Sequence, residues 1–409
     1  MKVWRSLGRP RTAIVAATIL ATVAITTVPL AAPASAATSA ANLPAAVGLK
    51  AYVYSGTGYT FTEGDGSYAQ HLLDGRVIWF FSDSFLGTVS PDGSRGSSGM
   101  LHNQIVVQDS PTASSASSFH NVWPNGWGTN AFAASGCSAE WPAASIQSAL
   151  NQVEVVLRCA DSGGNVVRLD LATLTINSGL TGWTVSIDTT NFNSAALVPG
   201  MSCSPNPSTA QVEFGQSIMQ LGGYTYIYGL QACPVSGIPE GHAYVARVSG
   251  NDISQPGSWQ YWNGASSWVS GPANAAPMLS GGTPIIHAGS EYSVVYDPSR
   301  NLYRMISSDT GPSSSVVEYT AAPNPYGPWT YDGIIDNTQA DGVYGSKPVD
   351  DPSSPCTLTT YGAKEQPTFE VNGDIVFTYN VNVTGCSAAD EEAAFQANVA
   401  NYNPVFMYG

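Results

Sequence analysis

The sequence predicts an all-β protein, a single-domain five-bladed β-propeller. Its 409 residues include 41 glycines, 27 prolines and 20 tyrosines, and only 11% are charged, a composition of turns and strands. Strand-like runs recur in five clusters spaced roughly 60–75 residues apart, as the blades of a propeller do. A β-sandwich is the alternative, but a sandwich domain ordinarily needs only about 100 residues.

The first element is a targeting segment. A basic stretch from Lys2 to Arg11 precedes an apolar run and a small-residue site at Ala34-Ser35-Ala36. This is the pattern of a secretory signal peptide. We therefore expect residues 1–36 to be removed and residues 37–409 to form the propeller domain of a secreted, extracellular protein that no membrane holds after cleavage.

Each of the five clusters reads as two strands around a turn, followed by a third strand. The turn signals are Asp74-Gly75, Gly222-Gly223, Asp297-Pro298 and Asn372-Gly373. The clusters are 67–83 with 103–109, 151–160 with 165–176, 212–232 with 242–249, 291–309 with 314–322, and 366–382 with 404–409. The one convincing helix is the alanine-rich stretch 387–401, with acidic residues in its first turn.

Six cysteines predict three disulfides, because an even count in an exported chain indicates a disulfide framework. Fifteen pairings are formally open. We expect sequential pairing, since it closes local loops, and each bridge then stabilises the fold by about 3 kcal/mol. The expected pairs are Cys137–Cys159, Cys203–Cys233 and Cys356–Cys386.

The first cluster contains a hairpin with an aspartate on each arm. If Leu73-Asp74-Gly75 is a three-residue loop with Gly75 left-handed, Asp65 faces Asp83. Opposite residues of an antiparallel pair share a face, with Cβ atoms about 4.5–5.5 Å apart. A two-residue loop is the alternative, and it would place the two carboxylates on opposite faces.

Two neighbouring carboxylates make an acid and a base from identical side chains, because the first charge raises the pKa of the second group. Glycoside hydrolysis uses such a pair. Gly64 and Gly66 would leave room for a ligand beside Asp65. Direct cross-strand neighbours favour the short separation of retaining enzymes, yet propeller glycosidases often invert, so both outcomes stay open.

The stretch "GDGSYAQHLLDGRVIWFFSDSFLG", with "MLHNQIVVQD" after it, resembles the first blade of secreted propeller families of actinobacterial type that are related to endo-D-arabinanases. Further similar segments are "EYSVVYDPSRNLYRM" and "FTYNVN". Those enzymes are five-bladed glycoside hydrolases that act on arabinofuranose polymers. The resemblance implies that Asp65 and Asp83 are the catalytic carboxylates, and it does not say which is the acid.

Other side chains are candidates for holding the substrate. A histidine near a propeller axis can orient a carboxylate, and a loop tryptophan offers a flat face to a sugar. The substrate-binding candidates are His102, Asn103, Trp123, Trp127, His287 and Glu291. Weaker carboxylate candidates are Glu140, Glu213 and Glu365. No metal-binding motif occurs, so we expect no cofactor, with an axial calcium ion as the alternative.

Together these features predict a secreted glycoside hydrolase, endo-acting and arabinanase-like, that cleaves a furanose-containing polysaccharide such as arabinan or arabinogalactan. A non-catalytic carbohydrate-binding propeller is the alternative. The formal net charge of −15 excludes nucleic acid as a partner, because the field repels polyanions. We expect a monomer whose only partner is the polysaccharide.

Overall fold

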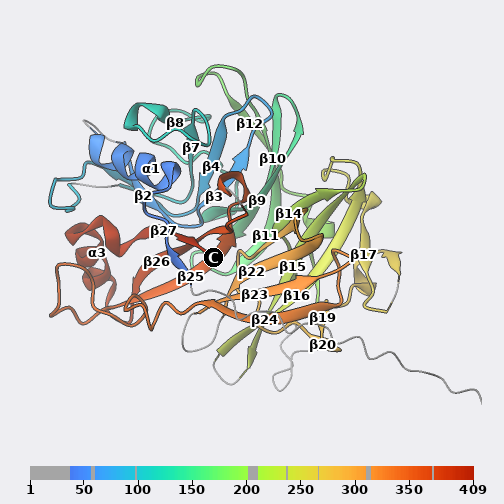
Figure 1. The fold of residues 1–409 in the computed structure, drawn as a ribbon. Coiled ribbons are helices and arrows are strands. Elements are labelled where there is room, and N and C mark those ends of the chain that lie inside the picture. The colour runs from blue at the N-terminus through green and yellow to red at the C-terminus, as the bar shows by residue number, and fades with distance from the viewer. Residues whose placement is uncertain are drawn as a thin grey trace, which may run out of the picture. The chain divides into compact units, whose positions relative to one another are not determined.

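The computed structural model describes residues 37–56, 60–96, 99–200, 211–235, 238–265, 267–309, 315–370 and 373–409. These residues are mostly β, and their sheets follow one another along the chain, as the colours of Figure 1 show. The predicted signal peptide, residues 1–36, lies outside the described residues.

The first cluster forms two small antiparallel sheets, ordered β3-β4-β7-β8 and β2-β5-β6. Their strands are β2 Thr60–Gly64, β3 Tyr68–His71, β4 Val77–Phe81, β5 Ser84–Gly87, β6 Gly99–Leu101, β7 Gln104–Gln108 and β8 Phe119–Val122.

The predicted hairpin register is confirmed. Tyr68 pairs with Phe80 and His71 with Val77. The loop closes with the bond from Leu72 N to Arg76 O at 2.8 Å, and Gly75 has φ +91°, which glycine adopts without strain. Strand β4 is buried along its whole length.

The next two clusters form a four-stranded and a six-stranded sheet, ordered β12-β11-β10-β9 and β13-β14-β15-β16-β17-β18. Their strands are β9 Ala139–Ala149, β10 Gln152–Ala160, β11 Val166–Thr175, β12 Thr184–Asp188, β13 Leu197–Pro199, β14 Gln211–Leu221, β15 Tyr224–Val235, β16 Ile238–Ser249, β17 Gln260–Trp262 and β18 Trp268–Ser270. The predicted turn at Gly222-Gly223 joins β14 to β15.

The last two clusters form sheets ordered β20-β19-β24-β23-β22-β21 and β1-β27-β26-β25. The first strand of the described chain thus pairs with the last, Thr38 with Tyr408. The strands are β1 Thr38–Ser39, β19 Leu279–Ser280, β20 Thr283–Pro284, β21 Ser293–Asp297, β22 Leu302–Ser308, β23 Val316–Ala321, β24 Trp329–Asp336, β25 Thr357–Glu365, β26 Val376–Thr384 and β27 Asn403–Tyr408.

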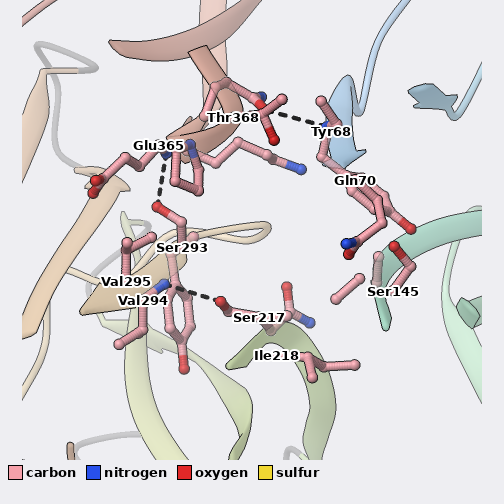
Figure 2. Close-up of a pocket in the computed structure, with 18 of the residues that line it drawn as sticks. Tyr68, Gln70, Ser145, Ser217, Ile218, Ser293, Val294, Val295, Glu365 and Thr368 are labelled. Carbon is pink, nitrogen blue, oxygen red and sulfur yellow. Dashed lines mark hydrogen bonds between the residues drawn. The ribbon is translucent and has the colours of Figure 1, made fainter. Parts of the chain in front are cut away.

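One strand of each cluster contacts the corresponding strand of the next. Strand β3 contacts β9, β9 contacts β14, β14 contacts β21, and β21 contacts β25. The short η4, Pro367–Phe369, contacts β3 again and so returns the series to its start. Hydrogen bonds join these inner strands, from Val294 N to Ser217 Oγ at 2.9 Å and from Glu365 N to Ser293 Oγ at 2.7 Å (Figure 2).

A cavity of about 400 Å³ lies among these inner strands, lined by residues from all five of them. Figure 2 shows Gln70, Ser145, Ser217 and Thr368 around it. Asp65, Asp83 and Glu291 do not line it.

The helices lie outside this series of strands. They are α1 Pro44–Ser55, α2 Asn193–Ala196 and α3 Ala388–Ala397, with short η1 Ala116–Ser118, η2 Pro256–Ser258, η3 Pro272–Asn274 and η5 Val399–Asn401. The predicted helix is confirmed as α3, where Ser387 accepts the N-cap bond from Asp390 N. The expectation that it is the one convincing helix is wrong, because α1 is also present. Helix α1 packs Gly48 against Phe119 so closely that a Cβ there would meet the ring at 2.3 Å.

Two predicted disulfides are present, Cys137–Cys159 and Cys356–Cys386. The third, Cys203–Cys233, involves Cys203, which lies outside the described residues. None of the described helices combines the length and the apolar character needed to cross a bilayer.

Candidate active site

The structure gathers three carboxyl groups, Asp65, Asp83 and Glu291, into what we call the carboxyl cluster. Asp65 lies just before β3, Asp83 follows β4, and Glu291 lies just before β21. The charges of Asp83 and Glu291 both act on Asp65 and raise its pKa. Residues more than 200 positions apart are thus brought to one site.

Asp65 and Asp83 are joined through their backbones. Asp65 N donates to Asp83 O at 3.1 Å, and Ser82 N donates to Asp65 O at 2.8 Å. The ladder resumes beyond them with Gly64 paired to Ser84. The hairpin register therefore continues past both aspartates, and their side chains leave neighbouring backbone positions.

Asp65 is held as a neutral acid at pH 7. Burial, then the charges of Asp83 and Glu291, raise its pKa to about 8, against hydrogen bonds that lower it. The Tyr361 hydroxyl donates to Asp65 Oδ2. Asp65 Oδ1 is buried and has no hydrogen-bond partner among the described residues. Such an atom in a native fold calls for a functional explanation.

Asp83 is oriented by two donors. His102 Nδ1 lies 2.9 Å from Asp83 Oδ1, and Trp141 Nε1 donates to the same oxygen at 3.0 Å. The hydrogen bond with Asp83 raises the pKa of His102 against the opposing effect of burial. The Tyr402 hydroxyl donates to the main-chain oxygen of Asp83 at 3.2 Å.

Glu291 is held in a strained backbone conformation. Its φ is +65°, a region that costs a non-glycine residue about 1 kcal/mol. Its amide donates to Gln216 Oε1 at 2.8 Å, and Lys364 Nζ lies 3.3 Å from its Oε2. Backbone strain of this kind concentrates at functional sites.

A basic side chain joins Glu291 to a further carboxylate. Arg158 Nε donates to Glu213 Oε2 at 3.1 Å, and Arg158 Nη1 lies 3.9 Å from Glu291 Oε1. Glu213, a weaker candidate in the sequence, therefore borders the carboxyl cluster.

The glycines beside Asp65 do not open space for a ligand, so that part of the prediction is wrong. A Cβ on Gly66, which has φ +63°, would meet Ser82 Oγ at 2.4 Å. One on Gly64 would meet Ser84 Oγ at 2.6 Å. Both glycines are required by the close packing of the two hairpin arms.

Other candidates lie elsewhere. His287 pairs with Asp309 at 3.1 Å. Asn103 is fully buried, and its amide bonds to the main chain of Phe132 and Glu140, so it positions a loop.

Two acidic candidates are also outside the cluster. Glu140 lies beside Asp170, and burial followed by that charge raises its pKa to about 8. Glu365 is completely buried in an ion pair with Arg304. Neither carboxylate is among the groups that act on Asp65.

The tryptophan pair lies at the outer edge of the first sheet. Trp123 follows β8, and its ring centroid is 6.4 Å from that of Trp127. Trp123 lines a cavity distinct from the one in Figure 2, whereas Trp127 is 67% exposed.

One group of metal-type ligands occurs among the described residues, Cys137, Glu140, Cys159 and Asp170. The two sulfur atoms are joined in a disulfide, and a thiolate is the form that binds metal. This donor set therefore does not fit a metal ion.

The sequence reasoning missed Tyr361, Tyr402, Lys364, Trp141 and Arg158. One signal was present, since Arg158 is the one cation of β10 and lies at the end of the apolar run Val155–Leu157, and a buried cation requires a partner. The other four carry no local motif.

The fold and the carboxyl cluster together define a mostly β protein in which Asp65 and Glu291, each just before an inner strand, lie with Asp83 in one acidic group. The family described as "Domain of unknown function (DUF5005)" matches residues 50–408, and the chain belongs to this family. A search of curated proteins finds no match.

Solved structures with a similar fold include a "putative hydrolase" from Bacteroides ovatus, with a TM-score of 0.63, 19% identity and 87% of each chain covered. Two further structures are a GH43_1 enzyme from Xanthomonas citri and an endo-arabinase from Bacteroides thetaiotaomicron. The first has a TM-score of 0.43, 12% identity and coverage of 86% of this chain and 88% of the other. The second has a TM-score of 0.42, 11% identity and coverage of 86% and 97%.

Proposed function

We propose that this protein is a secreted glycoside hydrolase built on a single-domain five-bladed β-propeller. The series of contacts from β3 through β25 and back to β3 supports the propeller, because each inner strand touches the next. The fold likeness to a structure described as a hydrolase supports hydrolysis. Two disulfides support export, since disulfides persist in oxidising compartments.

One observation carries the proposal, the pairing of a neutral Asp65 with Asp83 across the hairpin. Asp65 is the general acid, because its raised pKa of about 8 keeps it protonated at neutral pH. The proton of Asp65 passes to the glycosidic oxygen as the bond to the anomeric carbon breaks.

Asp83 is the second carboxylate of the reaction. Its bonds with His102 and Trp141 both go to Oδ1, which leaves Oδ2 for a substrate atom. In a retaining reaction Oδ2 attacks the anomeric carbon, and Asp65, now ionised, later takes a proton from water. In an inverting reaction Oδ2 takes the proton of the attacking water.

Glu291 and His102 complete the site in different roles. Glu291, fixed by Lys364 and Arg158, is placed to accept hydrogen bonds from sugar hydroxyls. His102 is a positioning residue that holds Asp83. The reaction needs no cofactor, and the substrate is a furanose-containing polysaccharide of the arabinan or arabinogalactan kind, cleaved internally by a monomeric enzyme.

The test is product sizing after incubation of the mature protein with arabinan, arabinogalactan and unrelated polysaccharides. We expect oligosaccharides of intermediate length from a furanose-containing polymer, and none from an Asp83→Asn variant. Proton NMR of the first product distinguishes retention from inversion. Binding without products would instead establish the alternative, a non-catalytic carbohydrate-binding propeller.

A further inference from the structure

We propose a second carbohydrate-binding site, separate from the carboxyl cluster, in a cavity of about 510 Å³ between α1, β8 and the loop that precedes β12. This volume is within the range of small-molecule sites, about 300–1,000 Å³. The ligand is a short segment of a neutral polysaccharide. The proposal rests on the proposed function only for the class of glycan.

The lining contains aromatic residues from three separate elements, of which Tyr52 and Trp123 are partly exposed and Trp183 is buried. Tyr52 comes from α1, Trp123 follows β8, and Trp183 precedes β12. Trp127 lies beside Trp123, with ring centroids 6.4 Å apart, and is 67% exposed. Aromatic faces stack on the apolar faces of sugar rings while sugar hydroxyls reach polar groups at the rim.

The polar groups of the cavity are neutral acceptors and donors. Asn121 Oδ1 is buried and has no hydrogen-bond partner among the described residues, and a buried acceptor of this kind costs free energy until a donor reaches it. Thr181 and His120 stand at the same cavity. A sugar hydroxyl is a donor of the right kind for Asn121.

The charge of the cavity excludes ionic ligands. Among the described residues that line it there is no Lys, Arg, Asp or Glu, and its one histidine, His120, pairs with Asp109 at 3.1 Å. The nearby Arg76 stacks on the Trp183 ring, and its charge is paired with Asp74 at 2.6 Å. The chain as a whole has a formal charge of −15, which repels polyanions. A neutral glycan remains as the ligand that matches both the aromatic surface and the absence of charge.

The position of the cavity defines its role. It shares no lining residue with the carboxyl cluster, and its elements lie on the outer side of the first sheet, where α1 contacts β8 (Figure 1). A second contact with the same polymer raises the effective concentration of substrate at the first site. The second site therefore retains the polymer between successive cleavages.

The experiment uses affinity electrophoresis of the full mature protein in gels that contain arabinogalactan, arabinan or the anionic polymer polygalacturonate. Every protein carries Asp65→Asn, so that the polymer is not consumed. We expect retardation by a neutral polymer and none by polygalacturonate. Trp123→Ala should weaken that binding at least fivefold, and Thr181→Arg, which fills the cavity with a charged chain from an exposed position, should weaken it similarly.

Two control variants keep the test specific. Trp123→Phe retains an aromatic face and should keep most of the affinity. Leu150→Ala removes an equally exposed apolar side chain, 67% exposed as Trp127 is, outside the cavity, and should change nothing. Equal binding by Trp123→Ala, Thr181→Arg and the parent, or binding by none of the proteins, overturns the proposal. Because the assay measures binding alone, a Trp123-dependent retardation supports this site even if product sizing finds no hydrolysis.

Discussion

The carboxyl cluster and the surroundings of Arg304 both contain buried acidic groups near the inner strands. The two places differ in what these acidic groups contact. Arg304 is 2% exposed and contacts Asp297 at 3.1 Å, Glu370 at 3.3 Å and both oxygens of Glu365. The oxygens of Glu365 are thus engaged by one guanidinium. At the carboxyl cluster, by contrast, Asp65 Oδ1 is buried without a hydrogen-bond partner among the described residues, and its charged neighbours are the carboxylates Asp83 and Glu291. A raised pKa is common to both places, since burial and Glu365 raise the pKa of Glu370 to about 9.

The comparison shows how the partners of a buried acidic group distinguish a structural role from a functional one. A buried ion pair with both partners engaged maintains the fold, and breaking it is costly because a charge is left alone. A buried acid with a raised pKa and a carboxyl oxygen without a hydrogen-bond partner does not stabilise the fold at neutral pH. Such groups are common at sites where chemistry takes place.

The largest expected effect comes from Asp65→Asn. Loss of the acid should lower kcat at least 10³-fold, within the range that general acid catalysis supplies. The same change should raise the free energy of unfolding at pH 7 by up to about 4 kcal/mol, because the unfolded aspartate ionises near pH 4 while the folded one, with its pKa of about 8, does not.

That gain in stability has a definite pH dependence. Because the pKa of Asp65 is raised in the folded state, its contribution to the free energy of unfolding is fully present below about pH 4. That contribution is lost as the pH rises to about 8. Urea denaturation at pH 4 and pH 7 should therefore show a benefit of Asp65→Asn at pH 7 only. A loss of stability at both pH values would show that Asp65 maintains the fold, as the acidic groups around Arg304 do, and would contradict the difference between the two sites.

The second prediction concerns the structural side of the comparison. Arg304→Gln leaves Glu365 buried and unpaired, so the free energy of unfolding should fall by about 3–5 kcal/mol. Arg300→Gln is the matched control, since Arg300 is 54% exposed and lies 3.7 Å from Asp297, and it should cost less than about 1 kcal/mol. Equal effects in chemical denaturation would contradict the assignment.

The third prediction uses the pH dependence of turnover. Activity should fall above about pH 8 as Asp65 loses its proton. Tyr361 lowers the pKa of Asp65 through its hydrogen bond, so Tyr361→Phe should move this alkaline limit to higher pH. Tyr379→Phe, which alters a buried tyrosine near Asp336 instead, should leave the limit where it is. An unmoved limit in Tyr361→Phe would exclude Asp65 as its origin.

The smallest effect is expected for Trp141→Phe, which removes one of the two donors to Asp83 Oδ1. A hydrogen bond of this kind contributes about 1 kcal/mol, which corresponds to roughly fivefold in kcat. Trp262→Phe, in an aromatic group with Tyr326 and Trp268, is the control and should retain full activity. A loss equal in both variants would indicate a general packing effect.

Local chemistry explains why the hairpin could be predicted. The register follows from the turn at Leu73-Asp74-Gly75, and counting outward from it reached Asp65 and Asp83. The helix at α3 likewise carried its own N-cap, Ser387. Where a structure depends on neighbouring residues, the sequence was sufficient.

Long-range contacts explain what could not be predicted. Lys364 lies 298 positions from Gly66, whose carbonyl it reaches at 3.5 Å, and no periodicity encodes such a contact. Helix α1 contains Gly48 and the β-branched Val47 and Val53, so its own propensity is weak. Packing against Phe119 overrides that propensity.

The strand that pairs with β1 also brings Tyr402 to Asp83, because Tyr402 directly precedes β27. The hydroxyl groups around the two aspartates are therefore assembled only once the chain has been synthesised through Tyr408. A nascent chain interrupted before that point has neither the closing strand nor the completed site. Closure of the last sheet and completion of the hydrogen bonds around Asp83 are therefore one step in the folding of the chain.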